Sequence, residues 1–139
     1  MIDTDSKFGR MVKRHLNREY VVWLTTVGPG PTPQPRPVWF IWDGDSFLIF
    51  SQAKAHKVKH IRRNAQVALH FNTDETGEKH VIVFTGRARL DEGAAPAHKV
   101  PAYFKKYKAG IADLKMSPEE FSRYYSVAIR ITPGRVRGW

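Results

Sequence analysis

Short runs of β-branched and aromatic residues, divided by turn residues, dominate this chain of 139 residues. Such runs are typical of β-strands, because branched and aromatic side chains pack well on a pleated, half-buried surface. The runs do not alternate regularly with helical segments, so the pattern favours an antiparallel barrel or sandwich with peripheral helices over a parallel sheet. We therefore expect a mainly β fold with strands at residues 20–27, 37–42, 46–50, 66–73, 80–90 and 125–131.

Glycine and proline mark the connections. Asp43-Gly44-Asp45 between two apolar runs is a hairpin signature, and Gly86 inside a strand indicates a bulge or a close backbone approach. Residues 28–35 hold four prolines, so we expect a stiff, extended loop that joins neither a helix nor a strand ladder. Residues 133–139 are expected to form a basic tail.

Three segments are expected to be helical. Residues 6–17 carry apolar side chains at helical spacing, residues 92–108 place Tyr103 and Tyr107 on one face, and Ser117-Pro118-Glu119-Glu120 is a capping box with proline at the first helical position. For Trp23 and Phe84 we expect core positions only.

Composition limits the class of protein. With 42% hydrophobic residues, the chain can build one domain with a core over residues 1–139. The formal charge of +10 favours anionic ligands, and the absence of cysteine excludes thiol chemistry and Cys-based metal sites. No run of about 18 apolar residues occurs, so we expect a soluble, cytoplasmic protein.

The most informative segment for function is residues 50–63, where an apolar strand runs into a basic helix. Ser51, Gln52, Lys54 and Lys57 fall where the strand ends and the helix begins. Lysines are unfavourable at the positive end of a helix unless an anion is bound nearby. This segment therefore predicts a phosphate-sized anion site.

Two other interpretations carry less weight. His56 and His60 have the spacing of metal ligands, but cations surround them and no carboxylate occurs between Asp45 and Asp74, so we expect no metal. The aromatic hairpin beside a basic helix could stack nucleic-acid bases. A barrel core requires the same in-and-out aromatic pattern, so we do not expect a nucleic-acid partner.

Several ordered motifs together resemble one family. The chain resembles the pyridoxamine 5′-phosphate oxidase-like split β-barrel superfamily, in its flavin/deazaflavin oxidoreductase branch. The motifs lie at residues 36–40, 50–52 with Lys57, 61–64, 86–88, 103–107 and 128–139.

The resemblance implies an antiparallel, Greek-key split barrel of the FMN-binding-protein type, acting as a homodimer with a cofactor groove between subunits. It places residues 36–39 beside the cofactor ring and Ser51, Gln52 and Lys57 at its phosphate. Gln52 stands where the family more often has threonine, and the chain lacks the longer C-terminal region of vitamin B6 oxidases. The expected cofactor-binding residues are Arg36, Pro37, Val38, Trp39, Ser51, Gln52, Ala53, Lys54, Lys57 and Trp139.

Coenzyme F420 is favoured over FMN, because F420 carries a phosphodiester and a glutamate tail that suit the basic helix. The expected activity is hydride transfer from reduced F420 to an unsaturated organic acceptor, with no side-chain nucleophile. FMN-dependent oxidation and non-catalytic binding of flavin, heme or F420 remain alternatives. Trp39, Trp42, Tyr103, Tyr107 and a second subunit's Trp139 are expected to line the acceptor groove.

Overall fold

The computed structural model describes residues 2–3 and 5–139; Met1 and Thr4 lie outside the described residues. This part of the chain forms strands, α-helices and one short 3-10 helix. In chain order the elements are α1 (Lys7–Arg18), β1 (Val21–Val27), β2 (Pro33–Trp39), β3 (Ile41–Trp42), β4 (Phe47–Ser51), α2 (His56–Arg63), β5 (Gln66–His70), β6 (Ile82–Leu90), the 3-10 helix (Ala97–Lys99), α3 (Pro101–Asp113), α4 (Pro118–Tyr124) and β7 (Val127–Gly138).

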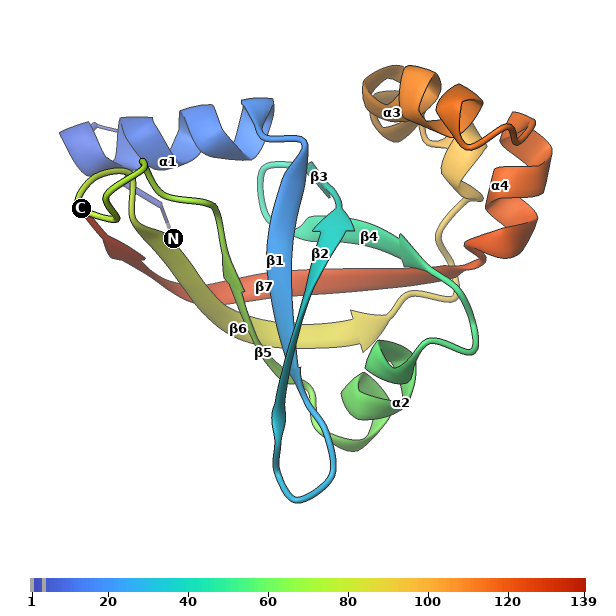
Figure 1. The fold of residues 1–139 in the computed structure, drawn as a ribbon, viewed down its shortest axis with the longest axis horizontal. Coiled ribbons are helices and arrows are strands. Elements are labelled where there is room, and N and C mark those ends of the chain that lie inside the picture. The colour runs from blue at the N-terminus through green and yellow to red at the C-terminus, as the bar shows by residue number, and fades with distance from the viewer. Residues whose placement is uncertain (1, 4) are drawn as a thin grey trace.

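The strands form one antiparallel sheet of seven, in the order β2-β1-β5-β6-β7-β4-β3. The two outermost strands, β2 and β3, follow one another in the chain and are separated only by Phe40. The sheet therefore curls until its two ends meet at Phe40 (Figure 1). Neighbours such as β1 and β5, or β4 and β7, are distant in sequence, as Greek-key connections require. The expected fold class is confirmed: the chain is mainly β, a curled antiparallel half-barrel with helices at its periphery.

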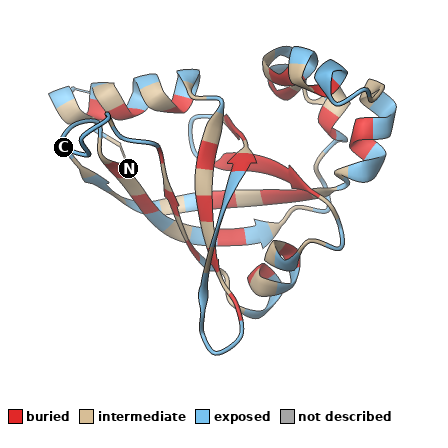
Figure 2. Cartoon of the chain, in the orientation of Figure 1, coloured by how far each residue is buried: buried red, intermediate tan, exposed pale blue. Residues whose placement is uncertain are grey.

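The inner face of the curled sheet carries the main hydrophobic core. In β1, buried Val22, Leu24 and Thr26 alternate with partly exposed residues, because only one face of the strand points inward (Figure 2). Helix α1 lies across one end of the sheet and adds Val12 and Leu16 to this core (Figure 1).

The expectation of core positions for two aromatic residues is half correct. Phe84 is fully buried. Trp23 alternates with the inward-facing residues of β1 and is only partly buried on the outer face, so a core role was wrong for it. Its Nε1 donates to Asn72 Oδ1 at 3.1 Å, and its ring is stacked on His70.

Helices α3 and α4 build a second apolar cluster against β4. Leu48 and Phe50 of β4 pack there with Tyr103, Tyr107 and Phe121. All 5 residues of β4 are buried, because the main core covers one face of the strand and this cluster covers the other. The capping box that begins α4 is present as expected.

The proline-rich segment was wrongly expected to stay outside any ladder. Strand β2 pairs with β1 from Pro33, opposite Val27, to Trp39, opposite Val21. Alternate residues of an antiparallel strand direct their N–H groups to the same side. Pro33, Pro35 and Pro37 alternate, so their nitrogens can all lie on the free edge of this outermost strand, where no donor is needed.

The expectation of a basic tail at residues 133–139 was also wrong. Strand β7 continues through this segment to Gly138, which pairs with Ile82. The bulge expected at Gly86 is confirmed by a register shift between Thr85 and Gly86. A Cβ at Gly86 would overlap the carbonyl oxygen of Thr132, so this close approach requires glycine.

The remaining element boundaries differ in smaller ways. The strand expected at 37–42 is divided at Phe40 between β2 and β3, and the strand expected at 66–73 ends at His70. The helix expected at 92–108 begins only with the 3-10 turn and continues to Asp113.

Candidate functional site

The turn between β4 and α2 has the character of an anion site. Strand β4 ends at Ser51, and Ala55 caps α2 without a side-chain hydrogen bond. The first turn of α2 contains no acidic residue. Free N–H groups at a helix N-terminus attract anions, and here no capping side chain satisfies them.

A groove of about 380 Å³ opens beside this turn. Ser51, Gln52 and Lys57 supply its polar wall, and Pro37 and Val38 of β2 form a second wall. The rest of the groove is largely aromatic, lined by Trp39, Phe50, Tyr103, Phe121 and Tyr125. A cavity with a polar end and an aromatic body suits a flat ligand that carries an anionic group.

Ser51 is already engaged within the protein. Its side chain is 2% exposed, and its Oγ donates to the carbonyl oxygen of Gln52 at 3.0 Å. The hydroxyl can donate to an anion only after rotation away from this carbonyl.

Lys57 and Arg36 place two positive charges beside the groove, and the described residues that line the groove and its adjoining cavity include no acid. Burial, and secondly the charge of Arg36, lower the pKa of Lys57. The ion pairs among the described residues involve Arg89 and Arg130, and neither Arg36 nor Lys57 belongs to one. The guanidinium of Arg36 donates to the carbonyl of Pro35, a neutral acceptor. A bound anion would relieve this repulsion, so the residues fit an anionic ligand.

A second cavity of about 590 Å³ adjoins the groove and shares Pro37, Ala55 and Lys57 with it. Arg36, His56 and His60 also line this cavity. Burial, followed by the charges of His56 and Arg63, lowers the pKa of His60. The Nδ1 of His60 lies 2.9 Å from the hydroxyl of Thr26, which fixes the ring beside β1.

Trp39 forms an aromatic wall of the groove that is held by stacking. Its ring is stacked on that of Tyr107, with centroids 4.5 Å apart and planes 5° apart. It also stacks on Phe121, with centroids 5.8 Å apart. The indole is therefore held from behind by α3 and α4 while it lines the groove.

Helix α3 also anchors the corner of the sheet next to Trp39. The backbone N–H of Phe40 donates to the Tyr107 hydroxyl at 2.8 Å, and that hydroxyl lies 2.6 Å from the carbonyl of Tyr20. The Lys106 ammonium donates to the carbonyl of Phe40 at 2.9 Å and lies 3.8 Å from the centre of the Phe40 ring. Burial lowers the pKa of Lys106 to about 8.

Comparison with known families matches nearly the whole chain to one of them. A profile described as pyridoxamine 5′-phosphate oxidase covers residues 9–139. The chain belongs to the pyridoxamine 5′-phosphate oxidase family. This family binds flavins and includes oxidoreductases. A comparison with curated proteins finds no match.

Solved structures of similar fold belong to proteins of different kinds. A conserved hypothetical protein, Rv2991 from Mycobacterium tuberculosis, has a TM-score of 0.75 at 21% identity. The match covers 96% of this chain and 84% of Rv2991. An F420 reductase has a TM-score of 0.65 at 23% identity, covering 90% and 94%. HutZ, a heme storage protein from Vibrio cholerae, has a TM-score of 0.66 at 14% identity, covering 92% and 92%. These likenesses establish the split-barrel fold of the family.

The structure brings together six of the ten expected cofactor residues of this family member. Pro37, Val38, Trp39, Ser51, Gln52 and Lys57 all line the groove.

The other four expected cofactor residues lie elsewhere. Arg36 lines the adjoining cavity, whereas Ala53 and Lys54 are exposed in the turn and line neither cavity. Trp139 is 67% exposed near the far end of the sheet, and its Nε1 donates to the carbonyl of Glu78 (Figure 1). Within one chain it does not reach the groove, so its assignment stays a prediction that requires a second copy.

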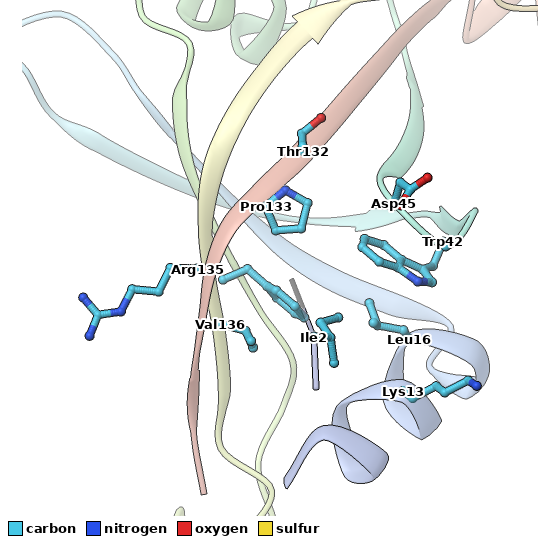
Figure 3. A pocket seen from close by; sticks show the side chains of 11 residues that line it. Ile2, Lys13, Leu16, Trp42, Asp45, Thr132, Pro133, Arg135 and Val136 are labelled. Atoms are coloured by element: carbon cyan, nitrogen blue, oxygen red, sulfur yellow. The ribbon is translucent and has the colours of Figure 1, made fainter. Parts of the chain in front are cut away.

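Two residues of the expected aromatic groove are placed differently. Tyr107 is fully buried behind Trp39 and does not line the groove. Trp42 lines a separate apolar cavity of about 490 Å³ with Leu16. In that cavity the charged ends of Lys13 and Arg135 point away from the apolar centre (Figure 3). The centre of this cavity is therefore poorly suited to a phosphate.

Sequence reasoning missed six groove residues: Val21, Phe50, Ala55, Leu114, Phe121 and Tyr125. Phe121 of α4 and Tyr125 at its C-terminal cap are spaced by one helical turn. This spacing indicates a packed helix face, but it does not indicate which cavity that face lines. Among residues 2–3 and 5–139, no group of three His, Asp or Glu side chains is placed to hold a metal ion. Nor is any helix in that range long and apolar enough to cross a membrane.

Proposed function

We propose that this protein is an F420-dependent reductase that transfers a hydride to an unsaturated, conjugated organic acceptor. The observation that carries the proposal is the pair of unneutralised cations, Arg36 and Lys57, beside a groove with an aromatic body. When bound, reduced F420 supplies a hydride. The chain itself then needs to hold the ligands, orient them and exclude water.

The adjoining cavity favours F420 over FMN. One phosphate can be held by Ser51, Gln52 and Lys57 alone, but the polar lining continues beyond them to the guanidinium of Arg36 and the imidazoles of His56 and His60. F420 carries a phosphodiester and a glutamate tail, and so presents several anionic groups in a row. A polar lining that runs from the groove into the second cavity, with the charges of Lys57 and Arg36 along it, suits such a ligand better than a single terminal phosphate.

The groove residues would have different roles in binding the ligand. Lys57 and Arg36 would bind the anionic part, and the free N–H groups of α2 would support them. Trp39, fixed by its stack on Tyr107, would form a rigid wall for a planar ring. Apolar Val38 and Phe50 would keep water from the reacting atoms.

We also propose that two copies of the chain complete the site. Helices α3 and α4 cover β4, whereas the outer face of β1, β5 and β6 carries partly exposed Trp23, His70 and Val83. These residues lie opposite one another in neighbouring strands, which gives a continuous surface for a second copy. Such a copy could bring its Trp139 to the groove of the first.

An FMN-dependent oxidoreductase is the second candidate, because the groove alone accommodates one phosphate and one ring. Titration of the purified protein with F420 and with FMN, followed by tryptophan fluorescence, separates the two. We expect micromolar or tighter binding of F420 and weaker binding of FMN. The reverse order would support the second candidate, and binding of neither would refute both.

Turnover distinguishes an enzyme from a binding protein. We expect reduced F420 to be oxidised in the presence of some members of a panel of enones and quinones. Tight F420 binding without oxidation across the whole panel would instead support a carrier role. Analytical ultracentrifugation tests the dimer, and a monomer at tens of micromolar protein would refute that part of the proposal.

A further inference from the structure

Tyr103 is a groove residue whose polar group the protein does not use. The side chain is 1% exposed, and its ring is packed edge-on against Phe50, with centroids 4.9 Å apart, and tilted against Tyr107, with centroids 4.8 Å apart. Its neighbour Tyr107 uses its hydroxyl to bind the backbone of Phe40 and Tyr20. The Tyr103 hydroxyl forms no hydrogen bond with any residue in the described part of the chain.

The hydroxyl nevertheless is not sealed inside the protein. Within the described residues, no fully enclosed side-chain oxygen or nitrogen lacks a hydrogen-bond partner. The Tyr103 oxygen has none, so it must reach open volume, and the open volume that Tyr103 lines is the groove. A ring locked by its neighbours thus presents one free hydroxyl to the ligand space.

We infer that Tyr103 donates a hydrogen bond from this hydroxyl to a carbonyl oxygen of a flat, conjugated ligand lying against Trp39. The inference rests on the proposed function for the place of the ligand. Flavin and deazaflavin rings carry carbonyl oxygens on their polar edge, and so do enone and quinone acceptors. The shared chemistry is a carbonyl on a planar conjugated system, and ligands of the two kinds can be tested separately.

The surroundings of the Tyr103 hydroxyl keep it protonated, so that it can donate a hydrogen bond. Burial, and secondly the neighbouring Tyr107, raise the pKa of Tyr103, so the phenol stays protonated throughout the physiological range. Lys57, Ser51 and Gln52 act on the anionic part of the ligand. Of the described residues that line the groove, Tyr125 also carries a phenol hydroxyl, but its side chain is less buried than that of Tyr103.

A hydrogen-bond donor fixed in the groove has a measurable effect. A neutral hydrogen bond contributes about 0.5 to 1.5 kcal/mol, so its loss weakens binding roughly 2- to 13-fold. Because the hydroxyl has no partner among the described residues, its removal should leave the fold as stable as before. A hydroxyl with a structural role would give the opposite result, with lower stability and unchanged ligand affinity.

The test compares Tyr103→Phe with the wild type and with Tyr124→Phe, a matched change at a side chain that is 52% exposed outside the groove. Affinities are measured for F420, FMN, lumichrome, menadione and inorganic phosphate, together with the melting temperature. We expect Tyr103→Phe to keep the wild-type melting temperature and phosphate affinity. Binding of at least one carbonyl-bearing ring should weaken 2- to 13-fold, while Tyr124→Phe changes nothing.

The two ligand sources give different patterns. Weaker binding of F420, FMN and lumichrome assigns the hydroxyl to the cofactor ring, whereas weaker binding of menadione alone, to cofactor-loaded protein, assigns it to the acceptor. If the wild type binds neither F420 nor FMN, the proposed function fails, but lumichrome and menadione, each titrated into the ligand-free protein, still decide the role of Tyr103. Unchanged affinity for every ring, a wild type that binds no ring, or a lower melting temperature in Tyr103→Phe would overturn the inference.

Discussion

Lys57 offers the sharpest test of the anion site, because its removal should affect binding and stability in opposite directions. The perturbation is Lys57→Met, which keeps most of the length and apolar contacts of the half-buried side chain and removes only the charge. In the free protein this charge is disfavoured by burial and repelled by Arg36, and both lower the pKa of Lys57. We therefore expect Lys57→Met to unfold at the same temperature as the wild type or at a higher one.

The loss of affinity follows from the type of contact. A hydrogen bond between a charged donor and a phosphate oxygen contributes about 1.5 to 3 kcal/mol, which corresponds to roughly a 10- to 150-fold change in dissociation constant. Among the described residues, the groove wall holds no other lysine or arginine, so no neighbouring side chain replaces Lys57 there. Arg36 in the adjoining cavity keeps the residual affinity above zero.

The assay is fluorescence titration with F420 and FMN, with thermal denaturation on the same samples. Lys59→Met is the matched control, because Lys59 is an exposed lysine of the same helix that lines neither cavity. If Lys59→Met loses as much affinity as Lys57→Met, the loss is due to the net charge of the protein and not to a specific contact of Lys57. Wild-type affinity in Lys57→Met would refute the anion site, and a melting temperature several degrees lower would refute the argument from repulsion.

Three further outcomes concern the scaffold around the groove. Tyr107→Phe leaves the buried N–H of Phe40 unpaired, so we expect a loss of about 2 to 4 kcal/mol and a melting temperature lower by roughly 6 to 14 °C, measured by circular dichroism; a change within about 2 °C would contradict this. The pKa of Lys106 is about 8 in the folded state and 10.5 ordinarily, so the unfolded chain binds this proton more tightly and the free energy of unfolding should rise between pH 8 and 10.5. After allowance for solvent screening, that rise is about 1 to 2 kcal/mol, and urea titrations should show a flatter profile for Lys106→Met. Gly86→Ala should cost about 1 to 3 kcal/mol, because the new methyl group meets a carbonyl oxygen of β7, and equal urea midpoints would exclude that clash.

Local sequence signals predicted the turn between strand and helix after Ser51 well. The change from an apolar run to a basic run around Ser51 is visible in the chain, and β4 and α2 divide there. The bulge at Gly86 was equally predictable, because a glycine inside a long strand is typical of a bulge or a close backbone approach. In each case the signal itself is local, although the contact that requires glycine at position 86 comes from Thr132 in β7.

Features that depend on pairing were harder to predict. Prolines 33, 35 and 37 oppose strand structure when each is considered alone, but their alternation suits the last strand of a sheet. The sequence of residues 28–35 does not indicate that this segment forms the outermost strand of the sheet. The basic residues after Pro133 were likewise assigned to a tail because their partner, β6, lies some fifty residues earlier in the chain.

The destinations of the aromatic residues depend on how the sheet curls. Trp39 and Trp42 are three residues apart, yet the corner at Phe40 sends one to the groove and the other to the apolar cavity. Tyr103 and Tyr107 share one helix face, but the first lines the groove and the second is used entirely to hold the corner. Helical spacing identifies which face of α3 is packed, but it cannot predict that one tyrosine lines the groove and the other binds the backbone at the corner.

The alternating prolines of β2 also restrict how this protein can associate. An exposed strand edge ordinarily invites another chain to extend the sheet, which leads to continuous sheets or to aggregation. Along Pro33, Pro35 and Pro37 an incoming strand would find no N–H donors, so this edge cannot template such growth. The proposed assembly of two copies would therefore use side-chain contacts between sheet faces, and the edge that flanks the groove would stay open to small molecules.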